Sequence, residues 1–140
     1  MRMPTQSVPG PQNPQTQTSY NEATQAMGLT PQEQFLYQHH LNNLYGGGRV
    51  VQPTGDVSTL LQAVVTGPDG RYYNIPTVWG GQVLEPDQAR AQAAQVGWDK
   101  WPAYDSPDVA DKRYGDMHDY LEKDTGAWIK QNPNYRSEFK

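Results

Sequence analysis

The chain has 140 residues, no cysteine and a formal net charge of −4. The length suits one domain with tails, and the absence of cysteine excludes a disulfide framework and a cysteine-based zinc site. The acidic balance disfavours a general nucleic-acid binder, which carries a clustered basic face, and no apolar run approaches the roughly 18 residues of a membrane span. Only 35 % of the residues are hydrophobic, so we expect a small core.

Residues 1–29 form the first predicted segment, an extended arm rich in Pro, Gln and Thr. Its only charged side chains are Arg2 and Glu22. With so few large apolar groups, the segment cannot offset the entropy lost on ordering. We therefore expect an arm that becomes ordered on a neighbouring chain.

Residues 30–55 are predicted to form an anchoring helix and a glycine-rich connection. The sequence Thr-Pro-Gln-Glu at 30–33 is a capping box with proline at the first helical position. The helix should end at the glycines 46–48, which adopt left-handed geometry at little cost. The following run should be flexible, with a turn at 53–56. The apolar stripe of this helix is Phe35, Leu36, Leu41, Leu44 and Tyr45.

Residues 56–131 are predicted to be the compact module, followed by a polar tail at 132–140. The stretches 58–65 and 71–78 are rich in Val, Leu, Tyr and Thr, and the Gly-Pro-Asp-Gly sequence at 67–70 separates them. This pattern predicts a β-hairpin.

Two helices are expected to cover that hairpin. Pro86 opens the first and Gly97 closes it, while Ser106 caps the second. We expect a bend or break at Gly126 and an end to the order at residues 132–134. The predicted fold class is α+β: a small β-hairpin sheet packed with two to three helices, preceded by a long extended N-terminal arm.

The sequence offers no complete catalytic or metal-binding constellation. His39 and His40 point about 100° apart on a helix and cannot easily share a metal ion. His118 and Glu122 lie one turn apart and could form one corner of a metal site, but no second motif supplies further ligands. The other carboxylates sit mostly at helix starts, where the helix dipole favours them. We therefore predict no enzyme, catalytic residue, metal, cofactor or small-molecule substrate.

Aromatic side chains are numerous for so small a module, and Trp and Tyr are favoured at interfaces. We expect Trp79, Trp101 and Tyr114 to be core residues. Stacking on bases is disfavoured because no basic residues are interleaved with the aromatic ones. The residues predicted to contact a protein partner are Tyr20, Phe35, Tyr37, Trp98 and Phe139.

The module also carries a series of short motifs, among them Ile-Pro-Thr at 75–77. The full set is Asp69–Gly81, Leu84–Ala89, Gly97, Trp101–Pro102, Tyr104–Ser106, Ala110, Tyr114 and Met117–His118. With these motifs, residues 56–123 resemble a small module found in virion-associated proteins of tailed bacteriophages, alone or within larger proteins. The chain departs from the pattern at Gln82, where a basic residue is common.

The resemblance implies a virion setting and leaves the station in the particle open. We predict a structural component at the head–tail junction or in the tail, assembled in the host cytoplasm. A reducing cytoplasm agrees with the lack of cysteine. The implied partners are portal, adaptor, tail or capsid subunits, in a symmetric multi-copy assembly without membrane. Three alternatives remain: a capsid cement protein, a regulatory protein outside the virion, and an accessory module beside a cell-wall hydrolase. The last would have a buried glutamate in a groove.

Overall fold

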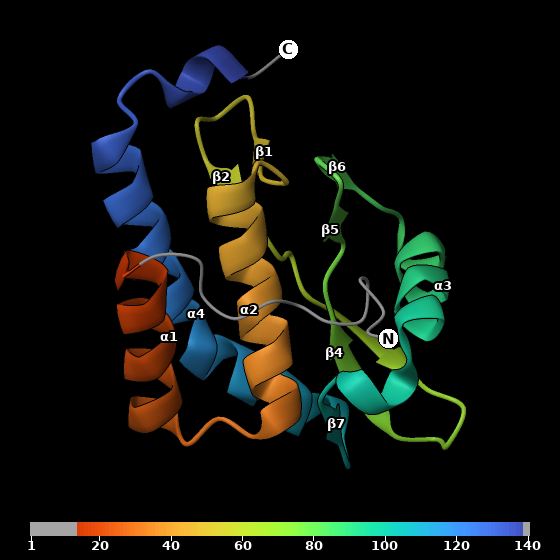
Figure 1. Cartoon of the computed structure of the whole chain (residues 1–140). Helices are drawn as coiled ribbons and strands as arrows, with labels where there is room; N and C mark the ends of the chain where they lie inside the picture. The colour runs from red at the N-terminus through yellow and green to blue at the C-terminus, as the bar shows by residue number, and fades with distance from the viewer. Residues whose placement is uncertain (1–13, 139–140) are drawn as a thin grey trace, which may run out of the picture.

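The computed structural model describes residues 14–138 and confirms the α+β class. Four α-helices and short antiparallel strands make up this part of the chain (Figure 1). The elements are α1 (Pro14–Met27), α2 (Pro31–Gly46), β1 (Val50–Val51), β2 (Val57–Ser58), β3 (Ala63–Thr66), β4 (Tyr72–Ile75), β5 (Val78–Trp79), β6 (Gln82–Val83), α3 (Pro86–Val96), the 3-10 helix η1 (Trp98–Lys100), β7 (Ala103–Tyr104), α4 (Pro107–Gln131) and the 3-10 helix η2 (Tyr135–Glu138).

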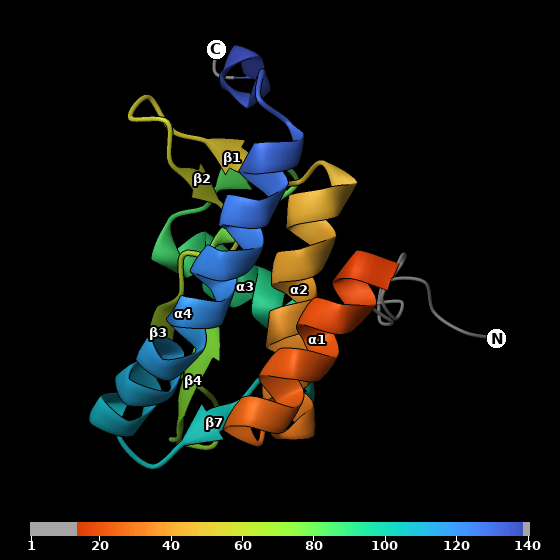
Figure 2. The same cartoon turned by 90° about the vertical axis from the view of Figure 1, so that its left-hand side faces the viewer.

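Helix α2 is the central element of the fold. Helices α1 and α4 pack against it and against each other, and α4 also packs on strands β3, β4 and β7. Helix α3 packs on β4 and η1, at the other side of the molecule (Figures 1 and 2). The sheet is therefore held between α4 and α3.

The predicted start and end of α2 are confirmed. The Thr30 side chain accepts a hydrogen bond from the Glu33 amide at 3.1 Å, and the Glu33 side chain accepts one from the Thr30 amide at 3.1 Å. At the other end Gly47 adopts a left-handed conformation with φ of 95°, which glycine reaches without steric cost.

The predicted β-hairpin is confirmed as β3 and β4, paired antiparallel with Val65 opposite Tyr73. Strand β4 ends at Ile75, directly before a proline that cannot continue the ladder. A third strand, β7, pairs with the other side of β4. It lies between the two predicted helices, where the sequence indicates no strand because two residues are too few to give an alternating pattern.

The structure corrects the extended arm over its second half, since residues 14–27 form helix α1. Ala23 is fully buried, Leu29 is 5 % exposed, and the Tyr20 hydroxyl donates to Oε1 of Gln34 at 2.9 Å. Helices α2 and α4 supply the apolar surface that this polar sequence lacks by itself. Residues 1–13 of the predicted arm lie outside the described residues.

Three further expectations differ from the structure. Helix α4 continues without a break through Gly126, because the buried Asp124 and Trp128 hold it on both sides. The connection predicted to be flexible contains β1, which pairs with β2. The predicted polar tail contains η2, in which the Tyr135 hydroxyl donates to the carbonyl oxygen of Gly55 at 2.8 Å.

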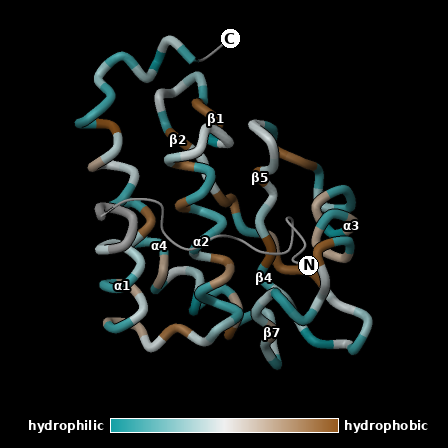
Figure 3. Tube along the Cα trace, viewed as in Figure 1, coloured by the Kyte–Doolittle hydropathy of each residue, from teal (hydrophilic) through white to brown (hydrophobic). Residues whose placement is uncertain are grey.

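The core lies where α2, α4 and β4 meet. Figure 3 shows hydrophobic residues next to β4 and in the link to α3, whereas α1 is drawn mostly white and teal. Trp101 is 2 % exposed, which confirms it as a core residue. Trp79 and Tyr114 are only partly buried against this core. The largest fully buried apolar side chains include Tyr37, Leu36, Leu41, Leu44, Leu60, Ile75 and Met117.

Candidate functional site

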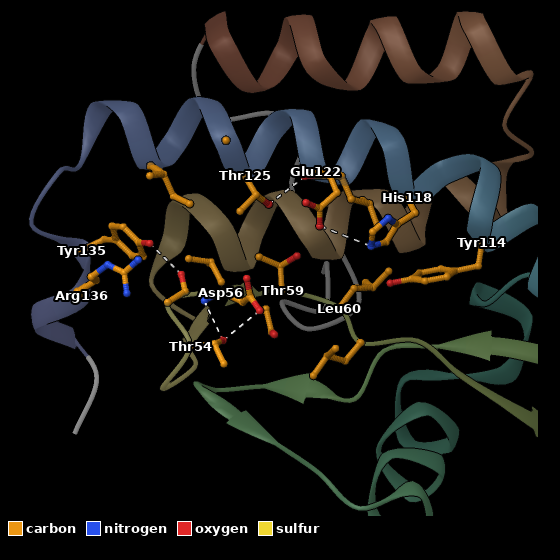
Figure 4. A pocket seen from close by; sticks show the side chains of 17 residues that line it. Thr54, Asp56, Thr59, Leu60, Tyr114, His118, Glu122, Thr125, Tyr135 and Arg136 are labelled. Atoms are coloured by element: carbon orange, nitrogen blue, oxygen red, sulfur yellow. Dashed lines mark hydrogen bonds and ion pairs between the residues drawn. The ribbon is translucent and has the colours of Figure 1, made fainter.

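A groove of about 490 Å³ runs along α4, between this helix and residues 54–61. Figure 4 shows Tyr114 at one end of the groove and Tyr135 with Arg136 at the other. The groove thus combines segments that lie far apart in the sequence, and η2 closes it at one end.

The groove has an apolar floor and a charged rim. Leu60 and Leu121 line it and are 1 % and 4 % exposed, so their side chains belong mainly to the core. On the rim, the Glu122 carboxylate lies 3.5 Å from Nε2 of His118, and both side chains are exposed. The hydroxyl of Thr54 donates to Asp56 at 3.0 Å. This lining suits an extended segment with small apolar groups and a cation.

The wall formed by residues 59–61 is fixed from inside the protein. Nδ1 of His40 lies 2.5 Å from Oγ1 of Thr59, and its Nε2 lies 3.1 Å from Oδ2 of Asp124. The Tyr37 hydroxyl donates to the same Asp124 oxygen. Because a carboxylate only accepts hydrogen bonds, we assign the imidazole proton to Nε2, so that the threonine hydroxyl donates to Nδ1.

This order of hydroxyl, imidazole and carboxylate is also that of an acyl-transfer triad. A nucleophile must be reached by substrate, but His40 is fully buried and Thr59 is 6 % exposed. The three groups come from α2, α4 and the segment between β2 and β3. We therefore assign them to holding these elements together, since buried polar groups need partners.

Leu61 is the one residue other than glycine with a positive φ among residues 14–138, at 44°. Its carbonyl oxygen accepts a hydrogen bond from the Thr77 hydroxyl at 2.7 Å, and the Leu60 carbonyl accepts one from the Thr77 amide at 2.8 Å. The side chain is 42 % exposed and lines the groove. The fold thus bears a strained backbone that presents an apolar side chain to solvent, a combination typical of functional positions.

A buried glutamate is present, but it is not in the groove. Glu33 is 1 % exposed and its carboxylate accepts from Nη2 of Arg113 at 2.7 Å, from Nε at 2.9 Å, and from the Tyr104 hydroxyl at 2.7 Å. Burial by itself would raise the pKa of Glu33, but the hydrogen bonds from Arg113 and Tyr104 together hold this pKa below its usual value. An ionised, paired carboxylate does not serve as a proton donor.

The predicted partner residues do not come together in one place. Tyr20 packs in the interface between α1 and α2, and Phe35 packs edge-on against Trp101 with ring centroids 5.0 Å apart. The prediction for Tyr37 is corrected, since its side chain is fully buried and has no surface to offer. Phe139 lies outside the described residues.

Trp98 is the predicted contact residue whose surroundings form a hollow. Its ring packs edge-on against Tyr73 at 4.9 Å between centroids, and the Arg90 guanidinium lies 5.4 Å from its ring. Together with Arg71 and Asp99 it lines a second hollow of about 290 Å³. Its role as a contact residue stays a prediction.

Sequence reasoning missed most of the groove. The sequence predicts Tyr114 as a core residue and identifies His118 only as one corner of an incomplete metal site, and Leu61 and Tyr135 carry no local signal for a site. Their meeting depends on the packing of α4 on residues 54–61, and no local pattern encodes that packing. Within residues 14–138, no three His, Asp or Glu side chains are grouped so that they could hold a metal ion. None of the described helices combines the length and the hydrophobicity that a membrane span requires.

Comparison with known protein families, curated proteins and solved structures finds no match to this chain.

Acid should destabilise the fold through His39, whose Nε2 lies 2.8 Å from the Val78 carbonyl oxygen. Burial lowers the pKa of this imidazole to about 4, whereas an unfolded histidine titrates near about 6.5. Between these values the unfolded chain binds more protons, so stability falls as the pH falls. We expect a loss of about 2–3 kcal/mol in the free energy of unfolding, less than the whole pKa shift corresponds to, because His39 is only partly buried.

Urea denaturation from about pH 7 down to pH 4 measures this effect. His39→Gln keeps a donor toward Val78 and should flatten the dependence on pH. The matched control is His118→Gln, because that histidine is exposed. An unchanged slope in His39→Gln would contradict the prediction.

Proposed function

We propose that this chain is a non-enzymatic structural component of a tailed-bacteriophage virion, at the head–tail junction or in the tail. It acts by binding neighbouring subunits in a symmetric multi-copy assembly. The observation that carries the proposal is the series of motifs between residues 69 and 118, which resembles the virion-associated module.

The places of these motif residues support a structural reading of the pattern. Ile75 is fully buried, and Nδ2 of Asn74 donates to the Ala110 carbonyl oxygen at 2.9 Å, joining β4 to α4. The Thr77 hydroxyl binds the Leu61 carbonyl. These residues build one hairpin–helix unit, so the pattern requires no catalytic role.

The groove along α4 supports a binding role. It offers apolar surface, charged rim groups and the strained Leu61, and its polar groups lie on the rim where a partner could reach them. The alternative of an accessory module beside a cell-wall hydrolase gains no support, because the buried Glu33 lies outside the groove and is paired with Arg113.

Quantitative mass spectrometry of purified phage particles tests the proposal. We expect a low copy number that matches the rotational symmetry of the junction or tail. Copies on the order of hundreds would instead indicate a capsid cement protein. Absence of the chain from the particle would overturn the proposal.

The role of the N-terminal segment is best tested by deleting residues 1–13. A deletion of 1–29 would also remove α1 and the buried Ala23 and Leu29, and would confuse folding with assembly. We expect the shorter deletion to keep the melting temperature within about 2 °C, because the described helices are intact. Incorporation into particles should be lost, and wild-type incorporation would contradict an anchoring role.

A further inference from the structure

We infer that the groove along α4 binds residues 1–13 of a neighbouring copy of this chain. The inference rests on the proposal that the chain works in a multi-copy assembly, and it identifies the occupant of the groove. Four observations carry it: the length of the groove, the chemistry of its lining, the position of α1, and the strained Leu61.

The length of the groove suits this segment. Tyr114 and Ile129 line the groove along α4 and lie 15 positions apart, which corresponds to about 22 Å of helix. A polyproline II segment rises about 3.1 Å per residue, so about seven residues fill the groove. The 13 residues before α1 reach about 40 Å and leave about six residues as a link between copies.

The chemistry of the two surfaces is complementary. The segment 1–13 contains three prolines, one arginine and no acidic residue. The groove offers the rings of Tyr114 and Tyr135, and aromatic grooves bind proline-rich segments that lose little entropy on docking. The exposed carboxylate of Glu122 stands on the rim as a partner for Arg2.

The position of α1 favours a neighbouring copy over the same chain. Figure 4 shows α1 on the opposite side of α4 from the groove, and Glu22 of α1 pairs there with Lys123 at 3.1 Å. A path around half of a helix about 11 Å wide takes about 17 Å, so the chain's own groove would require about 39 of the 40 Å available. In a neighbouring copy the segment does not have to pass around α4, so more of its length remains for the link between the copies.

Leu61 lines the groove in a left-handed backbone conformation, which is unfavourable for leucine. Its left-handed backbone is held by Thr77, and its exposed side chain faces the site of docking. Asparagine adopts this backbone conformation more readily than leucine. Leu61→Asn should therefore keep or raise stability while it removes an apolar contact. A variant that weakens binding while it keeps or raises stability shows that the loss of binding does not come from a loss of folding.

Binding of the segment of one copy by the groove of the next is a head-to-tail contact. Such a contact produces a closed ring or an open chain of subunits, depending on the angle between neighbours.

Sedimentation velocity of the full chain over a range of concentrations tests the inference. We expect self-association that an excess of a synthetic peptide of residues 1–13 reverses. Leu61→Asn and Glu122→Arg should each weaken it about tenfold. The control is Asp119→Arg, the same charge change on an exposed residue of α4 that does not line the groove. A monomer at all concentrations, or association that the peptide and both groove variants leave unchanged, would overturn the inference.

Cross-linking of a mixture of isotope-labelled and unlabelled full chains identifies the source of the segment. A photoreactive residue at position 61 should capture residues 1–13 in mixed-label pairs. Capture within one chain only would overturn docking between copies. All of these measurements use the pure chain and are independent of the mass spectrometry of phage particles. A failure of the docking inference can therefore be distinguished from a failure of the proposed virion function.

Discussion

Replacing Arg113 by alanine is expected to lower the free energy of unfolding by about 3–5 kcal/mol, because the change leaves a buried charge without its partner. The Arg113 guanidinium makes two hydrogen bonds to the carboxylate of Glu33, at 2.7 and 2.9 Å, and that carboxylate is almost fully buried. Removing the arginine leaves the carboxylate with the Tyr104 hydroxyl and the Thr30 amide as its remaining donors.

The matched control is the preceding residue, Lys112. Its ammonium group pairs with Asp116 at 3.2 Å, but both side chains are exposed, and exposed pairs contribute little. Urea denaturation should therefore show a large loss for Arg113→Ala and a loss of less than about 0.5 kcal/mol for Lys112→Ala. Equal effects of the two substitutions would contradict the assignment of the buried pair.

The dependence on pH provides a second test of the same pair. In the native protein the pKa of Glu33 is held below its usual value, so the pair contributes stability above the unfolded pKa of about 4.3 and loses it as the pH falls through the folded value. In Arg113→Ala burial remains while the main hydrogen bonds that lower this pKa are gone. The difference between the two proteins should therefore be largest near neutral pH and shrink in acid.

The sequence predicts the helix ends and the hairpin turn, because these features depend on only a few neighbouring residues. The capping box at Thr30, the turn at 67–70 and the proline at the start of α3 each depend on a few neighbouring residues. Each carries its own hydrogen bonds or backbone preference, so the sequence identifies it without knowledge of the rest of the chain.

The sequence does not predict α1, β7 or the groove, because each of them depends on contacts with segments that lie far away in the chain. Helix α1 has few apolar residues and is stabilised where Ala23 and Leu29 meet α2 and α4. The strand β7 exists because β4 offers a free edge. In the same way, the groove forms only when α4 packs beside residues 54–61, and the left-handed Leu61 has no signature in its local sequence.

The two tryptophans that the sequence placed in the core should respond differently to truncation. Trp101 is 2 % exposed, its indole nitrogen donates to the Ala93 carbonyl oxygen at 3.1 Å, and its ring contacts those of Phe35 and Trp79. Trp101→Ala removes a buried ring and a hydrogen bond from the junction of α2 and α3. We expect a loss of about 3–5 kcal/mol in the free energy of unfolding.

Trp79 provides the internal comparison, because it belongs to the same aromatic cluster but is only partly buried. Its indole nitrogen donates to the Pro76 carbonyl oxygen at 2.9 Å, three residues away, and its ring lies 4.6 Å from that of His39. Trp79→Ala should therefore cost about 1–2 kcal/mol, since solvent can occupy part of the vacated space. Urea denaturation of both variants measures the difference. A loss for Trp79→Ala as large as that for Trp101→Ala would place both rings equally in the core, and a larger one would make Trp79, and not Trp101, the centre of the cluster.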